Sequence, residues 1–247
     1  MYSIIEKENA LKAVLTKDEN SFILENPTSG CEARAVFEAV FKLPESARKF
    51  ARHLCGYTMT SNLRLSPKYL ENDGPDAAVP DEAMDFLGIY GTYGNQILLP
   101  RLKGSHIGPL YNIIGDGWYS DLLLLAIYNF FREERGQEVL YNYTLRTLLP
   151  ENEEYAAELQ AYLQSYCVKS KLRPWYIFLE TNLLWDYAEW NCTDRDYRPR
   201  ELWNGHFEDY TQGRCGMHPE RMADYQESCA NSIDRILRRS IRMREKL

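Results

Sequence analysis

The chain has 247 residues, of which 29 are basic and 36 acidic, so its formal net charge is −7. This length is enough to bury a hydrophobic core, and a hydrophobic fraction of 45% is ordinary for a globular protein. The composition therefore excludes a chain that is disordered along most of its length. The negative charge disfavours binding of a nucleic-acid backbone over the whole surface.

The sequence contains no targeting segment and no membrane-spanning segment. Its first residues lack the basic and apolar regions of a secretory signal. Its most apolar run, residues 122–131, is about half as long as a membrane span. The six cysteines lack the spacing of secreted disulfide scaffolds. We therefore expect a cytoplasmic protein with free thiols and no membrane partner.

The first quarter of the chain predicts a small β-hairpin followed by two helices. Leu11–Thr16 and Ser21–Glu25 are β-prone runs separated by a polar turn. Apolar residues at helical spacing predict a helix at Cys31–Leu43. A second helix is predicted at Glu45–Cys55, with Gly56 as its C-cap.

The rest of the chain predicts one short strand and four helices. The strand is expected at Asn95–Leu99. The helices are expected at Asp121–Glu134 with Ser120 as N-cap, Glu151–Cys167, Pro174–Trp190 and Pro219–Lys246. The first of these helices is apolar on all sides, which places it at the centre of the fold.

These elements predict a mainly α fold, with α+β as the alternative, that contains a small N-terminal β-hairpin. We expect a single globular domain over residues 1–247. Glycine and proline are frequent at 57–80, which marks a sub-boundary, and 191–217 is expected to be irregular before the last helix.

The irregular stretch contains the only grouping that suggests a cofactor. Cys192, His206, Cys215 and His218 lie within 27 residues, and two residues separate Cys215 from His218. Zinc is held by four such ligands in a tetrahedron, and a loop with little apolar material gains stability from a metal. The hypothesis is a structural zinc, set against the alternative that these side chains are simply packed. No other cofactor is expected.

A second motif lies in the predicted helix at 45–55. Arg48 is followed by four residues and then His53, which resembles the Rx4–6H motif of the HEPN family of helical ribonucleases. The resemblance implies that Arg48 and His53 cleave RNA without a metal, usually at a dimer interface. The motif lies early in this chain, whereas in the family it lies late in the helical bundle. Alternatively, these residues form the basic end of a short helix.

Other common catalytic motifs are absent. The sequence has no P-loop, GxGxxG, GxSxG or HExxH pattern. Gly104-Ser-His-Ile-Gly108 resembles the HIGH signature of class I nucleotidyl transferases, but Pro109 replaces the second histidine. These absences remove most nucleotide-binding and hydrolase interpretations.

Two segments suggest a binding surface instead. Tyr90 and Tyr93 lie among glycines in an acidic, lysine-free and arginine-free stretch, residues 69–100. The last predicted helix is basic, and we expect its Arg238, Arg239 and Arg242 to be exposed contacts for an acidic partner or for nucleic acid. A further hypothesis is that this helix docks on the acidic residues at 71–85, within one chain or between two.

The favoured function is a non-catalytic interaction protein that binds a protein partner through acidic and aromatic surfaces. Small, acidic, tyrosine-rich chains without catalytic motifs resemble, in composition alone, the accessory, inhibitor or immunity-type proteins of bacterial and phage conflict systems. The alternative is the HEPN-like ribonuclease that uses Arg48 and His53.

Overall fold

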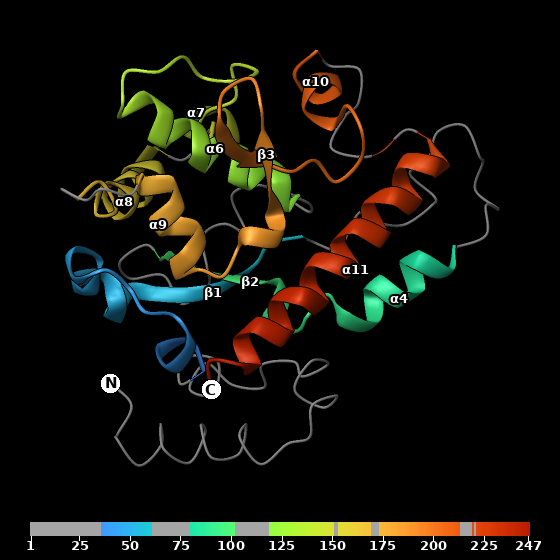
Figure 1. The fold of residues 1–247 in the computed structure, drawn as a ribbon, viewed down its shortest axis with the longest axis horizontal. Helices are drawn as coiled ribbons and strands as arrows, with labels where there is room; N and C mark the ends of the chain where they lie inside the picture. The colour runs from blue at the N-terminus through green and yellow to red at the C-terminus, as the bar shows by residue number, and fades with distance from the viewer. Residues whose placement is uncertain are drawn as a thin grey trace.

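The computed structural model describes residues 36–60, 80–101, 119–150, 153–168, 173–212, 219 and 221–247. Within them the chain is mainly helical (Figure 1). Residues 36–40 are helical. The other helices, with 3-10 helices written as η, are η1 (Glu45–His53), α4 (Asp81–Ile89), η3 (Tyr93–Asn95), α6 (Ser120–Glu133), α7 (Leu145–Leu148), α8 (Glu153–Gln164), α9 (Pro174–Thr181), η4 (Trp185–Tyr187), α10 (His206–Thr211) and α11 (Met222–Arg244).

Two small antiparallel strand pairs accompany these helices. β1 (Leu54–Thr58) pairs with β2 (Gln96–Pro100), and β3 (Ala188–Asn191) pairs with β4 (Asp196–Pro199). β2 confirms the strand predicted at 95–99. The predicted N-terminal hairpin, Leu11–Thr16 with Ser21–Glu25, lies outside the described residues. The described fold is thus mainly α with a minor β component.

The helix predicted at Glu45–Cys55 is shorter than expected. It is a 3-10 helix that ends at His53, and the next residues form β1. Gly56 is therefore not a helix cap. It lies in the strand opposite Leu98, and a Cβ at this position would lie 2.8 Å from the ring of Phe37. The glycine permits this close packing.

The helix predicted at Pro174–Trp190 is also shorter, because the chain turns inside it. α9 ends at Thr181, and Leu183 adopts a left-handed conformation with φ of 53°. One turn of 3-10 helix follows before β3 starts at Ala188. Trp190 therefore lies on a strand and not on a helix.

α6 lies at the centre of the described fold, as its composition predicts. Every side chain from Ser120 to Phe131 is buried. α6 contacts α7, α8, α9 and β4, which surround it (Figure 1). Ser120 forms no capping hydrogen bond, and the N-cap position is Tyr119. α6 has 14 residues, and no described helix is both long enough and apolar enough to cross a membrane.

α11 runs beside α4 and contacts η3 and η4 (Figure 1). Its buried face carries Tyr225, Cys229 and Ile236. The same face also carries serines and arginines, which apolar periodicity does not predict. They are Ser228, Ser232, Ser240, Arg235 and Arg239. The helix approaches η3 so closely that a Cβ at Gly94 would overlap the backbone oxygen of Ile236.

Arg239 is fully buried and serves as a hydrogen-bond donor inside the core. Its Nε donates to the carbonyl of Asn182 at 3.0 Å. Its Nη1 donates to the carbonyls of Gly94 at 2.9 Å and Gln96 at 2.5 Å. The guanidinium also lies over the ring of Phe41, 5.4 Å from its centroid. Burial lowers the pKa of Arg239 to about 10, so the side chain remains charged at neutral pH.

Arg235 occupies the equivalent position one turn earlier in α11. It donates to the backbone carbonyls of Arg200 at 2.9 Å and Glu201, and it lies over the ring of Tyr187. The expectation that Arg239 is exposed for binding is therefore wrong. Buried carbonyls without strand or helix partners require donors, and these two arginines supply them.

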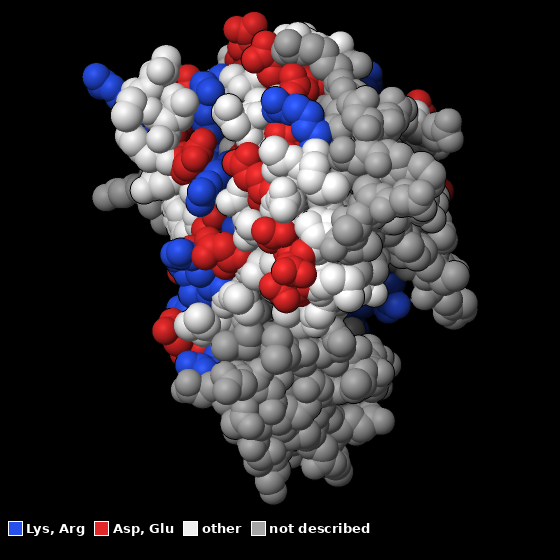
Figure 2. Space-filling model, turned by 90° about the vertical axis from the view of Figure 1, so that its right-hand side faces the viewer, with Lys and Arg blue, Asp and Glu red and all other residues white. Residues whose placement is uncertain are grey.

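The exposed arginines of α11 do not form an isolated basic surface. Arg238 pairs with Asp234 at 2.7 Å, and Arg242 pairs with Asp186 at 2.9 Å. On the face shown in Figure 2, Lys and Arg side chains are interspersed with Asp and Glu. α11 does pack against α4, the described part of the acidic stretch, where Gln226 contacts Glu82. Gln226 makes this contact through its side-chain amide, whereas Arg238 and Arg242 pair with carboxylates outside α4.

We predict that Arg239→Lys destabilises the protein by about 3 kcal/mol or more. Lysine keeps the charge but cannot reach three carbonyls at once, so buried acceptors lose their donors. Urea unfolding measures the change. Arg238→Lys, one residue away and solvent-exposed, is the matched control and should leave the unfolding midpoint unchanged. Equal midpoints for the two variants would contradict the assignment of Arg239 to the core.

Candidate binding site on the β3–β4 hairpin

The β3–β4 hairpin forms because Asn191 organises the turn between its strands. The side-chain Oδ1 of Asn191 accepts hydrogen bonds from the backbone N–H groups of Thr193 and Asp194, both at 3.0 Å. Arg195 then adopts a left-handed conformation with φ of 50°. An asparagine turn between β-prone aromatic residues is a hairpin signal. The prediction that residues 191–217 are irregular missed this hairpin and α10.

One face of the hairpin carries exposed aromatic side chains. Trp190 and Tyr197 are cross-strand partners with ring centroids 5.3 Å apart, and Trp190 is 50% exposed. Tyr197 also contacts Trp185 at 5.2 Å and Tyr176 at 5.8 Å, and all three are half-buried. We call Tyr176, Trp185, Trp190 and Tyr197 the aromatic patch. Aromatic side chains that retain exposed surface in a cluster mark contact sites.

The other face of the hairpin borders a pocket of about 110 Å³. Its polar lining comes from Glu189 and Asn191 of β3, Arg198 of β4, and Glu201. Its apolar walls come from Leu125, Leu140, Tyr141, Pro199 and Phe207. A pocket of this volume holds several water molecules. We call it the hairpin pocket.

Glu201 connects the hairpin pocket to α10. Its Oε1 accepts the backbone N–H of Phe207 at 2.7 Å, and its Oε2 accepts the N–H of Gly205 at 3.2 Å. Burial raises the pKa of Glu201, and these two hydrogen bonds oppose that effect only in part. Burial and the Glu201 charge also raise the pKa of Tyr141. The carboxylate of Glu201 thus imposes a negative potential on the pocket.

A buried pair of Asp121 and His206 lies behind Glu201. Asp121 of α6 accepts hydrogen bonds from Nδ1 of His206 at 2.7 Å and from the backbone N–H of Leu202 at 2.8 Å. The ring of His206 stacks on Trp203 with centroids 3.5 Å apart. Burial raises the pKa of Asp121, but the charges of His206 and Arg235 outweigh burial, so its pKa lies below the ordinary value.

The zinc hypothesis stays a prediction. Cys192 is exposed in the hairpin turn and His206 is buried, while Cys215 and His218 lie outside the described residues. Within the described ranges, no three His, Cys, Asp or Glu side chains form a group that would hold a metal. His206 Nε2 has no hydrogen-bond partner in the described part of the chain. A carboxylate on the other nitrogen, as Asp121 provides, is also the usual arrangement behind a metal-bound histidine.

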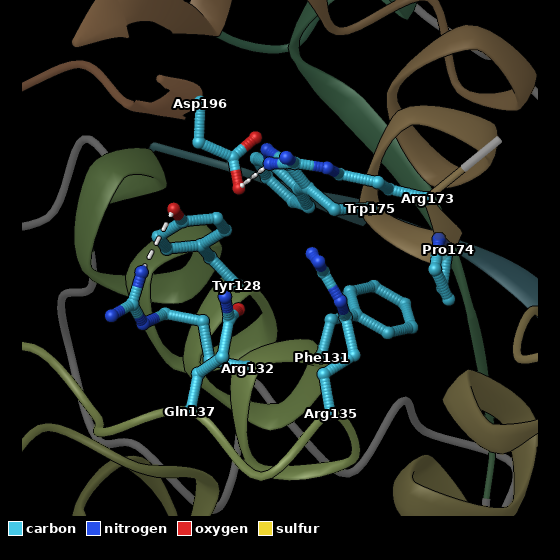
Figure 3. A pocket seen from close by; sticks show the side chains of 9 residues that line it. All are labelled: Tyr128, Phe131, Arg132, Arg135, Gln137, Arg173, Pro174, Trp175 and Asp196. Carbon is cyan, nitrogen blue, oxygen red and sulfur yellow. Dashed lines mark hydrogen bonds and ion pairs between the residues drawn. The ribbon is translucent and has the colours of Figure 1, made fainter. Parts of the chain in front are cut away.

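A second cavity lies between the end of α6 and the start of α9 (Figure 3). Its volume is about 10 Å³, which is roughly the space for one water molecule. Arg173 pairs with Asp196 at 2.5 Å, and Arg132 donates to the hydroxyl of Tyr128 at 3.4 Å (Figure 3). Two of the three arginines that line the cavity thus have partners, and because its volume is so small we assign it to packing.

The two residues of the ribonuclease hypothesis lie on η1, and both are exposed. A 3-10 helix has three residues per turn, so Arg48 and His53, five positions apart, project in directions about 120° apart. Joint action on one substrate would require them to converge. The hypothesis has not been tested, but this arrangement does not favour it.

The two tyrosines proposed for binding differ in their exposure. Tyr90 is half-buried, whereas Tyr93 is only 1% exposed. Tyr93 belongs to η3, which lies against α11, and its ring contacts Phe37 with centroids 6.1 Å apart. The expectation that Tyr93 is exposed is therefore wrong. Gly94, the next residue, permits the close approach of α11.

Comparisons of the chain with protein-family models, with curated proteins and with solved structures found no match. The chemistry of the hairpin and its pocket is therefore the basis of the functional proposal.

We predict that Asp121→Asn destabilises the protein by about 3–5 kcal/mol at pH 7, because it leaves buried His206 and Arg235 without their carboxylate. The folded pKa of Asp121 lies below the unfolded value of about 3.9. Its contribution is therefore present above that pH and is lost as the pH falls through the folded pKa. Urea unfolding at several pH values should show the difference between wild type and variant narrowing below about pH 4.

Asp85→Asn is the control for this experiment, because Asp85 is exposed on α4. It should unfold like the wild type at every pH. A constant difference between Asp121→Asn and the wild type down to low pH would contradict a buried, ionised Asp121.

Proposed function

We propose that this chain is a non-catalytic interaction protein that binds a protein partner through the aromatic patch of the β3–β4 hairpin. The observation that carries the proposal is the exposure of Trp190, whose ring protrudes from a cluster of three half-buried aromatic rings. Tryptophan and tyrosine supply most of the energy in many protein interfaces because they bury large areas with little loss of side-chain freedom.

The geometry of the patch favours a protein over a sugar or a nucleic acid. Its rings meet edge to face, with interplanar angles between 68° and 79° for the three contacts of Tyr197. The rings of the patch therefore do not form one flat surface, whereas stacked bases and sugars need flat, exposed ring faces. Charges of both signs lie beside it, because Arg173 lies over the ring of Tyr176 and Glu180 accepts a hydrogen bond from Nε1 of Trp185. Nucleic acid would instead require a basic rim.

From its composition, we further propose that this chain is itself an accessory, inhibitor or immunity-type protein of a bacterial or phage conflict system. Such a protein acts by occupying a surface of its target, which requires an interface and no catalytic centre. A rigid hairpin with a protruding tryptophan supports this mode of action, because a rigid contact loses little conformational entropy on binding.

We predict that Trp190→Ala lowers the affinity for the partner by about 30-fold or more, the loss expected for an aromatic hot spot. The tagged chain captures the partner from its native host in the presence of nuclease, and mass spectrometry identifies it. Titration of the purified pair then gives the affinity. Stability should change little, because half of the Trp190 side chain is exposed.

Met84→Ala is the matched control, since Met84 is a large apolar residue that is 58% exposed on α4, away from the hairpin. It should bind like the wild type. Equal affinities of the Trp190 and Met84 variants, or capture of nuclease-sensitive material alone, would refute the proposal.

A further inference from the structure

The hairpin pocket lies on the face of β3–β4 opposite the aromatic patch. Neighbouring strand residues point to opposite faces. Trp190 therefore belongs to the patch, while Glu189 and its cross-strand partner Arg198 line the pocket. Glu189 and Trp190 are neighbours on β3. A partner that contacts Trp190 and extends over the edge of β3 would therefore also reach the pocket.

The charged side chains that line the pocket differ in how far neighbouring charges compensate them. Arg198 is bound to Asp194 through both Nε and Nη2, and this carboxylate, which also lies 3.6 Å from Nη1 of Arg132, compensates part of its charge. In the described part of the chain, Glu201 is held by neutral backbone N–H groups. Glu189 is 62% exposed, and Arg200, whose Nε is 3.9 Å away, pairs with it across a solvent-exposed distance. The pocket is thus lined by two carboxylates and by one guanidinium whose charge Asp194 partly compensates.

The walls of the pocket suit a cationic ligand group. Tyr141 and Phe207 lie side by side with ring centroids 5.6 Å apart, and Tyr141 is 41% exposed. A cation over an aromatic face is attracted by the ring, and the aliphatic stem of a lysine or arginine packs on apolar walls. Each oxygen of Glu201 accepts one backbone N–H, which leaves acceptor capacity for a further donor.

We propose that the hairpin pocket receives a lysine or arginine side chain of the protein partner. This inference rests on the proposed function and specifies the chemistry that the partner must present. The cationic group lies between Glu189 and Glu201, and its stem lies against Tyr141 and Phe207. The aromatic patch supplies binding area, and the pocket selects a partner with a basic residue beside its contact for Trp190.

The test uses blocked amino acids as probes of the full chain. N-acetyl-arginine methylamide and N-acetyl-lysine methylamide are titrated against the protein by NMR, with N-acetyl-citrulline methylamide as the uncharged isostere. The backbone amides of Gly205 and Phe207 report directly on Glu201, because they donate to its carboxylate. We expect saturable shifts of these two signals with at least one cationic probe and none with citrulline.

Two variants and a control locate the binding. Glu189→Gln changes an exposed side chain and should weaken probe binding at least about fivefold, as should Glu201→Gln. Glu153→Gln, at an exposed position on α8, should have no effect. Saturation by citrulline equal to that by arginine, or no saturation by any probe, would overturn the proposal.

The partner experiment separates this inference from the proposed function. If Trp190→Ala abolishes partner binding while Glu189→Gln leaves it unchanged, the pocket inference fails and the interaction function stands. If the probes saturate the pocket and Trp190→Ala leaves partner binding intact, the cation site stands and the role of the aromatic patch fails.

Discussion

The guanidinium of Arg239 donates to backbone carbonyls from two distant segments of the chain, Gly94–Gln96 and Asn182. In the described part of the chain no carboxylate pairs with it. A buried charge costs several kcal/mol, and here only carbonyl dipoles and the ring of Phe41 offset that cost. α11 therefore joins the β1–β2 ribbon to the end of α9, and loss of this one side chain would leave both segments with unpaired acceptors.

The candidate site depends on the same helix. Arg235 of α11 binds the carbonyl of Glu201, and Asp121 of α6 binds the N–H of Leu202. The backbone beside the pocket is thus held from two sides by charged groups of two different helices. A wall fixed in this way does not have to be ordered when a ligand binds, which favours affinity. The buried Arg235 and Asp121 therefore connect the core to the hairpin pocket, because they bind the backbone of Glu201 and of the next residue, Leu202.

Apolar periodicity predicted the parts of this fold in which burial follows side-chain hydrophobicity. α6 and α8 lie close to their predicted bounds, because most of their buried side chains are apolar or aromatic. The burial of Arg235 and Arg239 could not be predicted, because periodicity does not indicate which carbonyls elsewhere lack donors. The hairpin site could not be predicted either, because Trp190 extends the apolar helical pattern at 174–190, and the positive φ of Leu183 has no signal in composition.

The order of these residues along the chain affects how the protein folds during synthesis. The carbonyls of residues 94, 96, 182, 200 and 201 all precede the arginines that bind them. A ribosome that has not yet passed residue 239 therefore holds a nascent chain whose α6 helix can form, but whose acceptors are paired only with water. These buried contacts therefore form only after the arginines of α11 have been synthesised, and until then the acceptors in the growing polypeptide lack their native donors.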